Sequence, residues 1–216
     1  MVPMDGMADS QLWYLKQIDL FKGLPEAELK YVSSCFRSKK YDKDTELPDV
    51  HDEDSVFLVK YGVVELYALT EDGRKIIIEI LGDGSVFGNL PDSENIAYFA
   101  RVKKNALVCR MMTEEFFKLV SKYPSVSEKL LRSMYSSISI QKERISSLAA
   151  ESVPERLRRL LRMISTQLLA EQNVSFTHEE LAQMIGTSRQ TVTTLINSLV
   201  KEGKLTKQGR QYRLVA

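Results

Sequence analysis

The stretch between residues 177 and 199 constrains the fold of this chain most strongly, because it predicts two short helices joined by a tight turn. Thr177 and Glu180 have the spacing of a capping box, which starts a helix. Gly186 can turn the chain without the steric penalty of a Cβ atom. Thr187, with Gln190 three residues later, is expected to cap the second helix. This order is typical of a helix-turn-helix.

Apolar side chains in this stretch recur at helical spacing and predict a shared core. They are Leu181, Ala182 and Ile185 in the first helix and Val192, Leu195, Ile196 and Leu199 in the second. The polar side chains that remain are of types that read DNA, since Arg suits the acceptors of guanine and Gln suits the edge of adenine. The predicted DNA contacts of the second helix are Thr187, Ser188, Arg189, Gln190, Thr191, Thr193, Thr194 and Asn197. An ordinary helical hairpin with a solvated face is the alternative, but caps, turn and apolar spacing together favour DNA binding.

The chain after this stretch predicts a wing. Gly203 is expected to end the second helix, and residues 204–207 and 210–215 form two short strands around a turn at Gln208 and Gly209. Lys204, Lys207 and Arg210 make this wing basic, which suits contacts with the DNA backbone.

The distribution of charge supports this interpretation. Overall, 30 basic and 29 acidic side chains nearly cancel. Residues 153–216 nevertheless hold 10 of the basic and only 5 of the acidic ones, so this part carries +5 and the remainder −4. A basic C-terminal module on a slightly acidic body fits a regulator with separate DNA-binding and sensing parts.

The middle of the chain predicts an antiparallel β-roll. Two helices are expected first, over residues 11–21 and from Pro25 to about residue 35. Short runs rich in Val, Ile, Phe and Tyr then follow, separated by turn signals such as Asp72-Gly73. The strand candidates are residues 55–60, 62–69, 75–81, 86–87, 96–102 and 107–112. The interior of such a roll can hold a small ligand.

A helix that begins at Thr113 is interrupted at Pro124, and a long helix then runs to about residue 150. Its apolar positions are spaced alternately by three and four residues, which is the pattern of a coiled-coil seam. The predicted dimer interface is Leu131, Met134, Ile138, Gln141, Ile145 and Leu148. Val126 and Leu130 lie off the seam and are expected to pack on the roll. The alternative is a helix packed on its own domain; the seam favours a two-fold homodimer.

A hinge is expected at Ser152, Val153 and Pro154, because the residue before a proline leaves the helical region. A helix over residues 155–170 follows, with leucines on one side and arginines on the other. Its arginines, Arg156, Arg158, Arg159 and Arg162, either touch phosphates or are solvated. The predicted domains are thus a sensing domain at 1–123, a dimerisation helix and hinge at 124–152, and a winged helix-turn-helix at 153–216. The fold class is α+β.

Several other classes of protein are disfavoured. We find no nucleophile–base pair, metal-ligand spacing or phosphate-cradling loop, so the chain is not expected to be an enzyme or to hold a metal. Two cysteines, Cys35 and Cys109, are too few for a disulfide framework or an iron–sulfur cluster of the four-cysteine type. No long apolar run or export signal is present, which predicts a cytoplasmic protein without a membrane partner.

The order of roll, long helix, hinge and winged helix-turn-helix resembles the bacterial regulators of the cyclic-AMP receptor protein and fumarate-nitrate reductase regulator (Crp/Fnr) family. The roll shows that family's glycine pattern at residues 59–62, 71–75 and 84–88. The helix-turn-helix is most similar to the carbon-monoxide-sensing haem regulators of the family, at residues 186–191 and 197–203. The resemblance implies a cyclic-nucleotide-binding-like jelly roll, a pseudo-palindromic double-stranded DNA operator and RNA polymerase as a partner.

Departures from the family pattern bear on the effector. Asn89 stands where the resemblance implies a Glu for a ribose hydroxyl, and residues 94–97 lack the Arg expected for the phosphate. A buried phosphate without that cation would be costly, which argues against cyclic AMP. Gly88, Asn89 and Leu90 also replace the haem sensor's ligands, so haem is possible only with other ligands, such as His51, Cys35, Cys109 or the N-terminus, and is not favoured.

A small molecule in the roll is the favoured effector, and the resemblance implies a neutral or phenolic one as an option, because another branch of the family binds such molecules there. The pocket candidates are Tyr67, Phe87, Gly88, Asn89, Tyr98 and Phe99, although the aromatic ones among them can equally be core. Sensing through the thiol of Cys35 or Cys109, or haem-based gas sensing, is an alternative. An effector-independent DNA-binding protein is another.

We call the predicted helix-turn-helix and its wing the reading head. In its second helix, Arg189 matches the first Arg that is common in the family, whereas Gln190 and Thr194 replace the family's Glu and second Arg. The loss of an acceptor for cytosine and of a donor for guanine should change the operator at those positions.

Overall fold

The computed structural model describes residues 14–48, 50, 54–88, 98–166, 175–209 and 211–214. The chain divides into two compact units. The first holds residues 1–66 and 80–136, and the second holds residues 67–79 and 137–216. The units are discontinuous in sequence, and the domain boundaries after residues 123 and 152 remain a prediction. Among the described residues, no helix is both long and apolar enough to cross a membrane.

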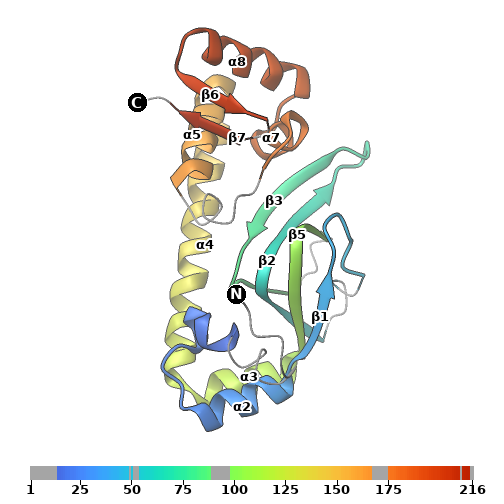
Figure 1. The fold of residues 1–216 in the computed structure, drawn as a ribbon, viewed down its shortest axis with the longest axis vertical. Helices are drawn as coiled ribbons and strands as arrows, with labels where there is room; N and C mark the ends of the chain where they lie inside the picture. The colour runs from blue at the N-terminus through green and yellow to red at the C-terminus, as the bar shows by residue number, and fades with distance from the viewer. Residues whose placement is uncertain are drawn as a thin grey trace. The chain divides into compact units, whose positions relative to one another are not determined.

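The first unit begins with helical segments. Residues 14–17 are helical, a 3-10 turn η1 (Asp19–Phe21) follows, and α2 (Glu26–Cys35) starts after Pro25, as predicted. Farther along the chain, α3 (Thr113–Lys122) begins at the expected residue, with Glu114 and Glu115 in its first turn, where a helix dipole favours anions. Helices α2 and α3 lie side by side (Figure 1), and Lys122 of α3 pairs with Glu28 of α2 at 3.4 Å.

The strands form a sheet in the order β1-β5-β2-β3, with β4 paired to β2. They are β1 (Arg37–Tyr41), β2 (Ser55–Leu69), β3 (Lys75–Leu81), β4 (Val86–Gly88) and β5 (Phe99–Met112). The pairing of β1 with β5 is antiparallel and sets Ser38 opposite Cys109. The pairing of β2 with β4 is also antiparallel and sets Phe57 opposite Phe87.

Three expectations about these strands were wrong. The runs 55–60 and 62–69 form the single strand β2, because Gly62 adopts φ 101° within it and lets the backbone of Asn105 approach. Residues 99–102 of the run 96–102 and the run 107–112 likewise belong to the single strand β5. Strand β1 was not expected, because its sequence RSKKY has no apolar alternation; its pairing with β5 forms it.

The first unit has two apolar clusters. In one, the helical segments pack on the sheet through Leu15, Phe21, Val32, Leu58 and Phe116, among others. Val126 is fully buried in this cluster and Leu130 packs against it, which confirms their predicted role. The other cluster lies between strands and includes Phe57, Val59, Val64, Phe87, Val102 and Val108. Each fully buried side chain of this size contributes about 1.5–3 kcal/mol of hydrophobic stabilisation.

Helix α4 (Pro124–Ala150) starts at the predicted proline. In the second unit its C-terminal part is followed by α5 (Val153–Thr166), α7 (His178–Ile185), α8 (Arg189–Lys201) and the paired strands β6 (Leu205–Gln208) and β7 (Gln211–Leu214). Strand β7 contacts α5 and β6 contacts α8 (Figure 1). Helices, an antiparallel sheet and a winged helix-turn-helix together confirm the α+β fold class.

Candidate nucleic-acid interface

The first helix of the helix-turn-helix, α7, begins at His178 and is capped by Thr177, as predicted. The Thr177 hydroxyl accepts the backbone N–H of Glu180 at 3.2 Å, and the Glu180 carboxylate accepts the N–H of Thr177 at 2.7 Å. Both bonds of the capping box are therefore present, and together they satisfy donors that a helix start leaves open.

The turn ends α7 in a left-handed conformation at Gly186, with φ 66° and ψ 51°. The N–H groups of Gly186 and Thr187 both donate to the carbonyl of Ala182. The next helix is capped by Ser188, whose hydroxyl accepts the N–H of Thr191 at 3.1 Å. The prediction of Thr187 as the cap was wrong, because Thr187 completes the turn and the helix starts one residue later.

The apolar faces of α7 and α8 are buried as expected. The buried side chains are Leu181, Ala182, Ile185, Val192, Ile196 and Leu199. Leu195, expected among them, is only partly buried. Leu157 and Leu161 of α5 are also fully buried in this unit. A shared apolar core thus holds α8 with one polar face outward.

That outward face carries the predicted reading residues. Ser188, Arg189, Gln190, Thr194 and Asn197 are exposed, and Thr187, Thr191 and Thr193 are partly buried. Arg189 lies in the first turn, where recognition helices concentrate their base contacts. Within the described part of the chain, Arg189 has no carboxylate partner. Its positive charge is therefore available for an anionic or acceptor-rich ligand.

The wing brings further cations to the same unit. In the antiparallel pair of β6 and β7, Lys207 is opposite Tyr212. Lys204 pairs with Glu202 at 2.7 Å, whereas no carboxylate pairs with Lys207 in the described ranges. Arg210, also predicted to contact DNA, lies outside the described residues.

His178 was missed by the sequence reasoning. It is the first residue of α7, and its partners Thr193 and Lys207 are 15 and 29 residues away. No local pattern in the sequence marks His178, because its hydrogen bonds join three separate elements, α7, α8 and β6.

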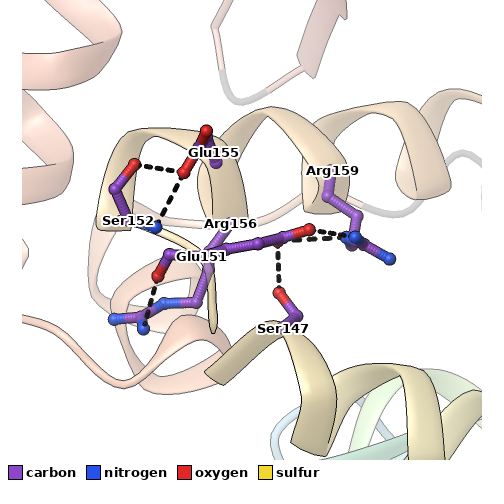
Figure 2. Close-up of polar contacts among 6 residues, drawn as sticks. All are labelled: Ser147, Glu151, Ser152, Glu155, Arg156 and Arg159. Atoms are coloured by element: carbon purple, nitrogen blue, oxygen red, sulfur yellow. Dashed lines mark hydrogen bonds and ion pairs between the residues drawn. The ribbon is translucent and has the colours of Figure 1, made fainter. Parts of the chain in front are cut away.

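The expected hinge at residues 152–154 was only partly right, because Val153 and Pro154 already belong to α5. The break between α4 and α5 is a polar junction (Figure 2). The Glu151 carboxylate accepts hydrogen bonds from the Ser147 hydroxyl at 2.5 Å and from the Arg159 guanidinium, which also forms an ion pair with it. Arg156 donates to the carbonyls of Leu148 and Glu151 at 3.3 Å, where the end of α4 leaves acceptors open. Arg156 and Arg159 therefore support the junction between the helices.

Arg144 connects three elements within the second unit. Its guanidinium donates to the carbonyls of Ile77 and Ile78 in β3 and to that of Met184 in α7, the last at 3.0 Å. Nearby, the Ser137 hydroxyl donates to Glu79 at 3.5 Å. Burial raises the pKa of Glu79, and the Ser137 hydrogen bond and the Arg144 charge oppose this rise. Arg144 thus connects α4, β3 and α7 within this unit.

The predicted effector residues are only partly brought together. Phe87 stacks on Phe57 with ring centroids 5.2 Å apart, and Tyr98 packs against the same cluster. Gly88 adopts φ 134°, and a Cβ there would lie 2.4 Å from the carbonyl oxygen of Ser55. Phe99 is 36% exposed. Tyr67 belongs to the second unit, where the Lys75 ammonium lies 4.0 Å from its ring centroid.

Asn89, residues 94–97 and His51 lie outside the described residues, so the departures from the family pattern remain sequence observations. Among the described residues of the first unit, Lys60 is a buried cation with 2% exposure. Its ammonium lies over the ring of Phe36 and donates to the hydroxyl of Ser38. Phe36 belongs to the cluster packed by the helices, not to the Phe57–Phe87 cluster. Among the described residues, no buried basic side chain packs with Phe87.

The two thiols differ in setting. Cys35 is partly buried and Cys109 is fully buried; both are free. Burial raises the pKa of the Cys109 thiol, although Lys60 and the Ser38 hydroxyl oppose this rise. A raised pKa lowers the thiolate fraction that oxidants attack, so Cys109 is poorly suited to redox sensing.

The predicted dimer seam is exposed on α4. Leu131 is 66%, Ile138 50% and Ile145 67% exposed. Met134 and Leu148 are exposed and Gln141 is partly buried. A row of large apolar side chains with this exposure indicates a surface that another molecule covers.

Comparisons with known proteins agree with these features. Residues 155–216 match the family model for a Crp-like helix-turn-helix domain, and residues 38–123 match the one for a cyclic nucleotide-binding domain. The transcriptional activator protein FnrL of Cereibacter sphaeroides is 24% identical over 172 residues, which cover 75% of this chain and 69% of that protein. The cAMP-activated global transcriptional regulator CRP of Salmonella typhimurium is 21% identical over 188 residues, covering 83% and 90%.

Solved structures with the same fold include a mutant of CooA from Carboxydothermus hydrogenoformans. It has a TM-score of 0.70 and 25% sequence identity, covering 86% of this chain and 85% of that one. FixK2 from Bradyrhizobium japonicum has a TM-score of 0.69 at 22% identity, covering 84% and 93%.

Proposed function

Because this chain belongs to the Crp/Fnr family of DNA-binding transcription regulators, we propose that it is a homodimeric, sequence-specific regulator gated by a small-molecule effector in its β-roll. The relatives are transcription regulators, and the chain is accordingly a regulator and not an enzyme. The observation that carries the proposal is the outward face of α8, where Arg189 and Gln190 are exposed on a helix held by a buried core.

The homodimer rests on the apolar row along α4. Two copies that pair through Ile138 and its neighbours would present two reading heads related by a two-fold axis. Such a dimer requires two half-sites about 34 Å apart, which is one turn of DNA, and therefore a pseudo-palindromic operator. RNA polymerase and a cytoplasmic setting are parts of the same proposal.

The proposed effector is an uncharged organic molecule, not cyclic AMP. This choice is supported by Asn89 in place of an acidic residue and by the apolar, aromatic surroundings of Phe87. The effector must bind the DNA-competent and DNA-incompetent states with different affinities, since equal binding would shift no equilibrium. The junction at Glu151 and the Arg144 contacts are the elements through which the shift would reach α8.

Selection of binding sequences from a random pool of duplex DNA tests the proposal. We expect the wild-type chain to enrich a pseudo-palindrome and to bind it with two chains per duplex. Arg189→Ala should enrich a sequence in which the preference at one base position is relaxed. Enrichment of a single, non-repeated site that binds one chain per duplex would contradict the proposal that the protein binds DNA as a homodimer. Full affinity without any added ligand would favour the effector-independent alternative.

An absorption spectrum of anaerobically purified protein, before and after addition of carbon monoxide or nitric oxide, separates the effector classes. We expect no Soret band. A strong Soret band that shifts with the gas would instead establish a haem sensor with other ligands. If no Soret band is present, a thermal-shift screen should show that uncharged aromatic compounds stabilise the protein and that cyclic AMP does not.

A further inference from the structure

His178 lies between the two parts of the reading head. Its Nδ1 atom is 2.8 Å from the Thr193 hydroxyl on α8, and its Nε2 atom is 3.4 Å from the Lys207 ammonium on β6. Its ring centroid is 6.1 Å from that of Tyr212 on β7. A single side chain at the start of α7 thus touches the recognition helix and both strands of the wing.

The chemistry of the partners assigns one direction to these hydrogen bonds. An ammonium group only donates, so Nε2 of His178 must accept from Lys207. A neutral imidazole with Nε2 as acceptor carries its proton on Nδ1, which then donates to the Thr193 hydroxyl. That hydroxyl in turn donates to the carbonyl of Arg189 at 2.9 Å. The bonds form one chain from the wing to the first turn of α8.

The surroundings of His178 keep its ring neutral. Its pKa is lowered by burial first, and then by the positive charges of Lys207 on β6 and Arg189 on α8. No carboxylate is among the causes of the shift. The ring is therefore an acceptor at neutral pH, which the bond from Lys207 requires.

Among the described residues, no carboxylate compensates the charge of Lys207. The imidazole accepts one of its N–H bonds, and the Tyr212 ring centroid lies 5.9 Å from its ammonium. By contrast, a carboxylate of Glu202 compensates the charge of Lys204. Lys207 is thus a positioned cation, and such a group suits a phosphate of the DNA backbone.

We propose that His178 is a positioning residue for DNA binding. It orients Lys207 of the wing toward a backbone phosphate and connects the wing to the recognition helix through its hydrogen bond with Thr193. This inference rests on the proposed DNA-binding function. The proposed ligand of Lys207 is a backbone phosphate of the same duplex whose bases Arg189 contacts.

Histidine NMR tests the geometry without DNA. The chain has two histidines, so ¹⁵N-histidine labelling of the His51→Gln variant leaves only the signals of His178. We expect a neutral ring protonated on Nδ1. Lys207→Gln removes a nearby positive charge and should raise the pKa of His178. A proton on Nε2, or a pKa that does not respond to Lys207→Gln, would overturn the inference.

A double-mutant cycle tests the function with the duplex that the wild-type chain selects. His178→Phe keeps a ring against Tyr212 but removes both hydrogen bonds, while His178→Gln retains an acceptor. We expect His178→Phe and Lys207→Gln each to lower the salt-dependence slope by about 1. The double variant should bind no more weakly than Lys207→Gln alone, and His178→Gln should recover part of the loss.

The outcomes separate the two proposals. Additive losses in the cycle, with unchanged melting temperatures, would show that His178 does not act through Lys207. A wild-type chain that selects no duplex would overturn the DNA-binding function instead, and the NMR result would still decide the hydrogen-bond chain.

Discussion

The guanidinium of Arg159 on α5 is paired with the carboxylate of Glu151, which lies just beyond the end of α4 (Figure 2). The two residues are separated by the junction, so a change in the angle between the helices would break the pair. Ser152 and Glu155 also bond to each other, but both would move with α5. Glu151 is therefore a residue whose partners report on the junction, as is Arg156, which donates to the carbonyl of Leu148 in α4.

We predict that Glu151→Gln loosens this junction. The amide is neutral and loses the ion pair with Arg159, so backbone amides around residues 151–156 should exchange with solvent faster. Hydrogen-exchange mass spectrometry of peptides that cover the junction measures this. Glu128→Gln is the matched control, because Glu128 pairs with Arg132 within one helix. Equal exchange in both variants would show that the pair does not hold the junction.

The same pair has a defined pH dependence. Hydrogen bonds from Arg159 and then Ser147 lower the pKa of Glu151 below its usual value of 4.5. A lowered folded-state pKa stabilises the folded protein above the unfolded-state value, and this stabilisation is lost as the pH falls through the folded-state value. The junction should therefore be insensitive to pH near neutrality and loosen only in acid.

Gly62→Ala should destabilise the roll by about 3 kcal/mol or more, because a non-glycine residue at positive φ costs roughly 1–2 kcal/mol and the clash adds to it. Gly62 has φ 101°, and a Cβ there would lie 2.4 Å from the carbonyl oxygen of Asn105. Gly73→Ala is the control, since its φ is 78° but nothing lies within 4 Å of the added atom. Urea unfolding of both variants measures the difference; equal losses would contradict the close approach.

Arg189→Ala should weaken binding to the selected duplex by about 1–3 kcal/mol and relax the preference at one base position. The reason is the loss of a two-pronged donor from the first turn of α8. Fluorescence anisotropy with the selected duplex and its single-base variants measures both effects. Arg132→Ala removes a cation of α4 that pairs with Glu128 and should leave affinity unchanged. Unchanged affinity for Arg189→Ala would remove Arg189 from the reading face.

Ile138→Asp should weaken the dimer, since it places a charge in the apolar row of α4. Sedimentation velocity across a range of concentrations should show monomer for this variant and dimer for the wild type. Ser136→Asp adds the same charge at an exposed position off the row and should remain dimeric. A dimeric Ile138→Asp would mean that the two copies pair through another surface.

The candidate site could be predicted only in part from the sequence. The polar face of α8 follows from helical spacing, which the burial of Val192, Ile196 and Leu199 then confirms. The cap at Ser188 was missed because Thr187 and Ser188 are both acceptable capping residues, and only the backbone of the turn chooses between them. Strand β1 was missed because pairing with β5, rather than its own residues, gives it a β conformation.

Short-range rules by themselves determined the cap of α7 at Thr177 and the turn at Gly186, because the atoms that decide them lie within four residues. Tertiary structure alone decided the contacts of His178 with Lys207 and of Arg144 with the carbonyls of β3. Those partners are 29 and at least 66 residues apart. Side-chain hydrogen bonds of such separation have no periodic signature; they arise only after apolar cores have fixed the backbones that carry them.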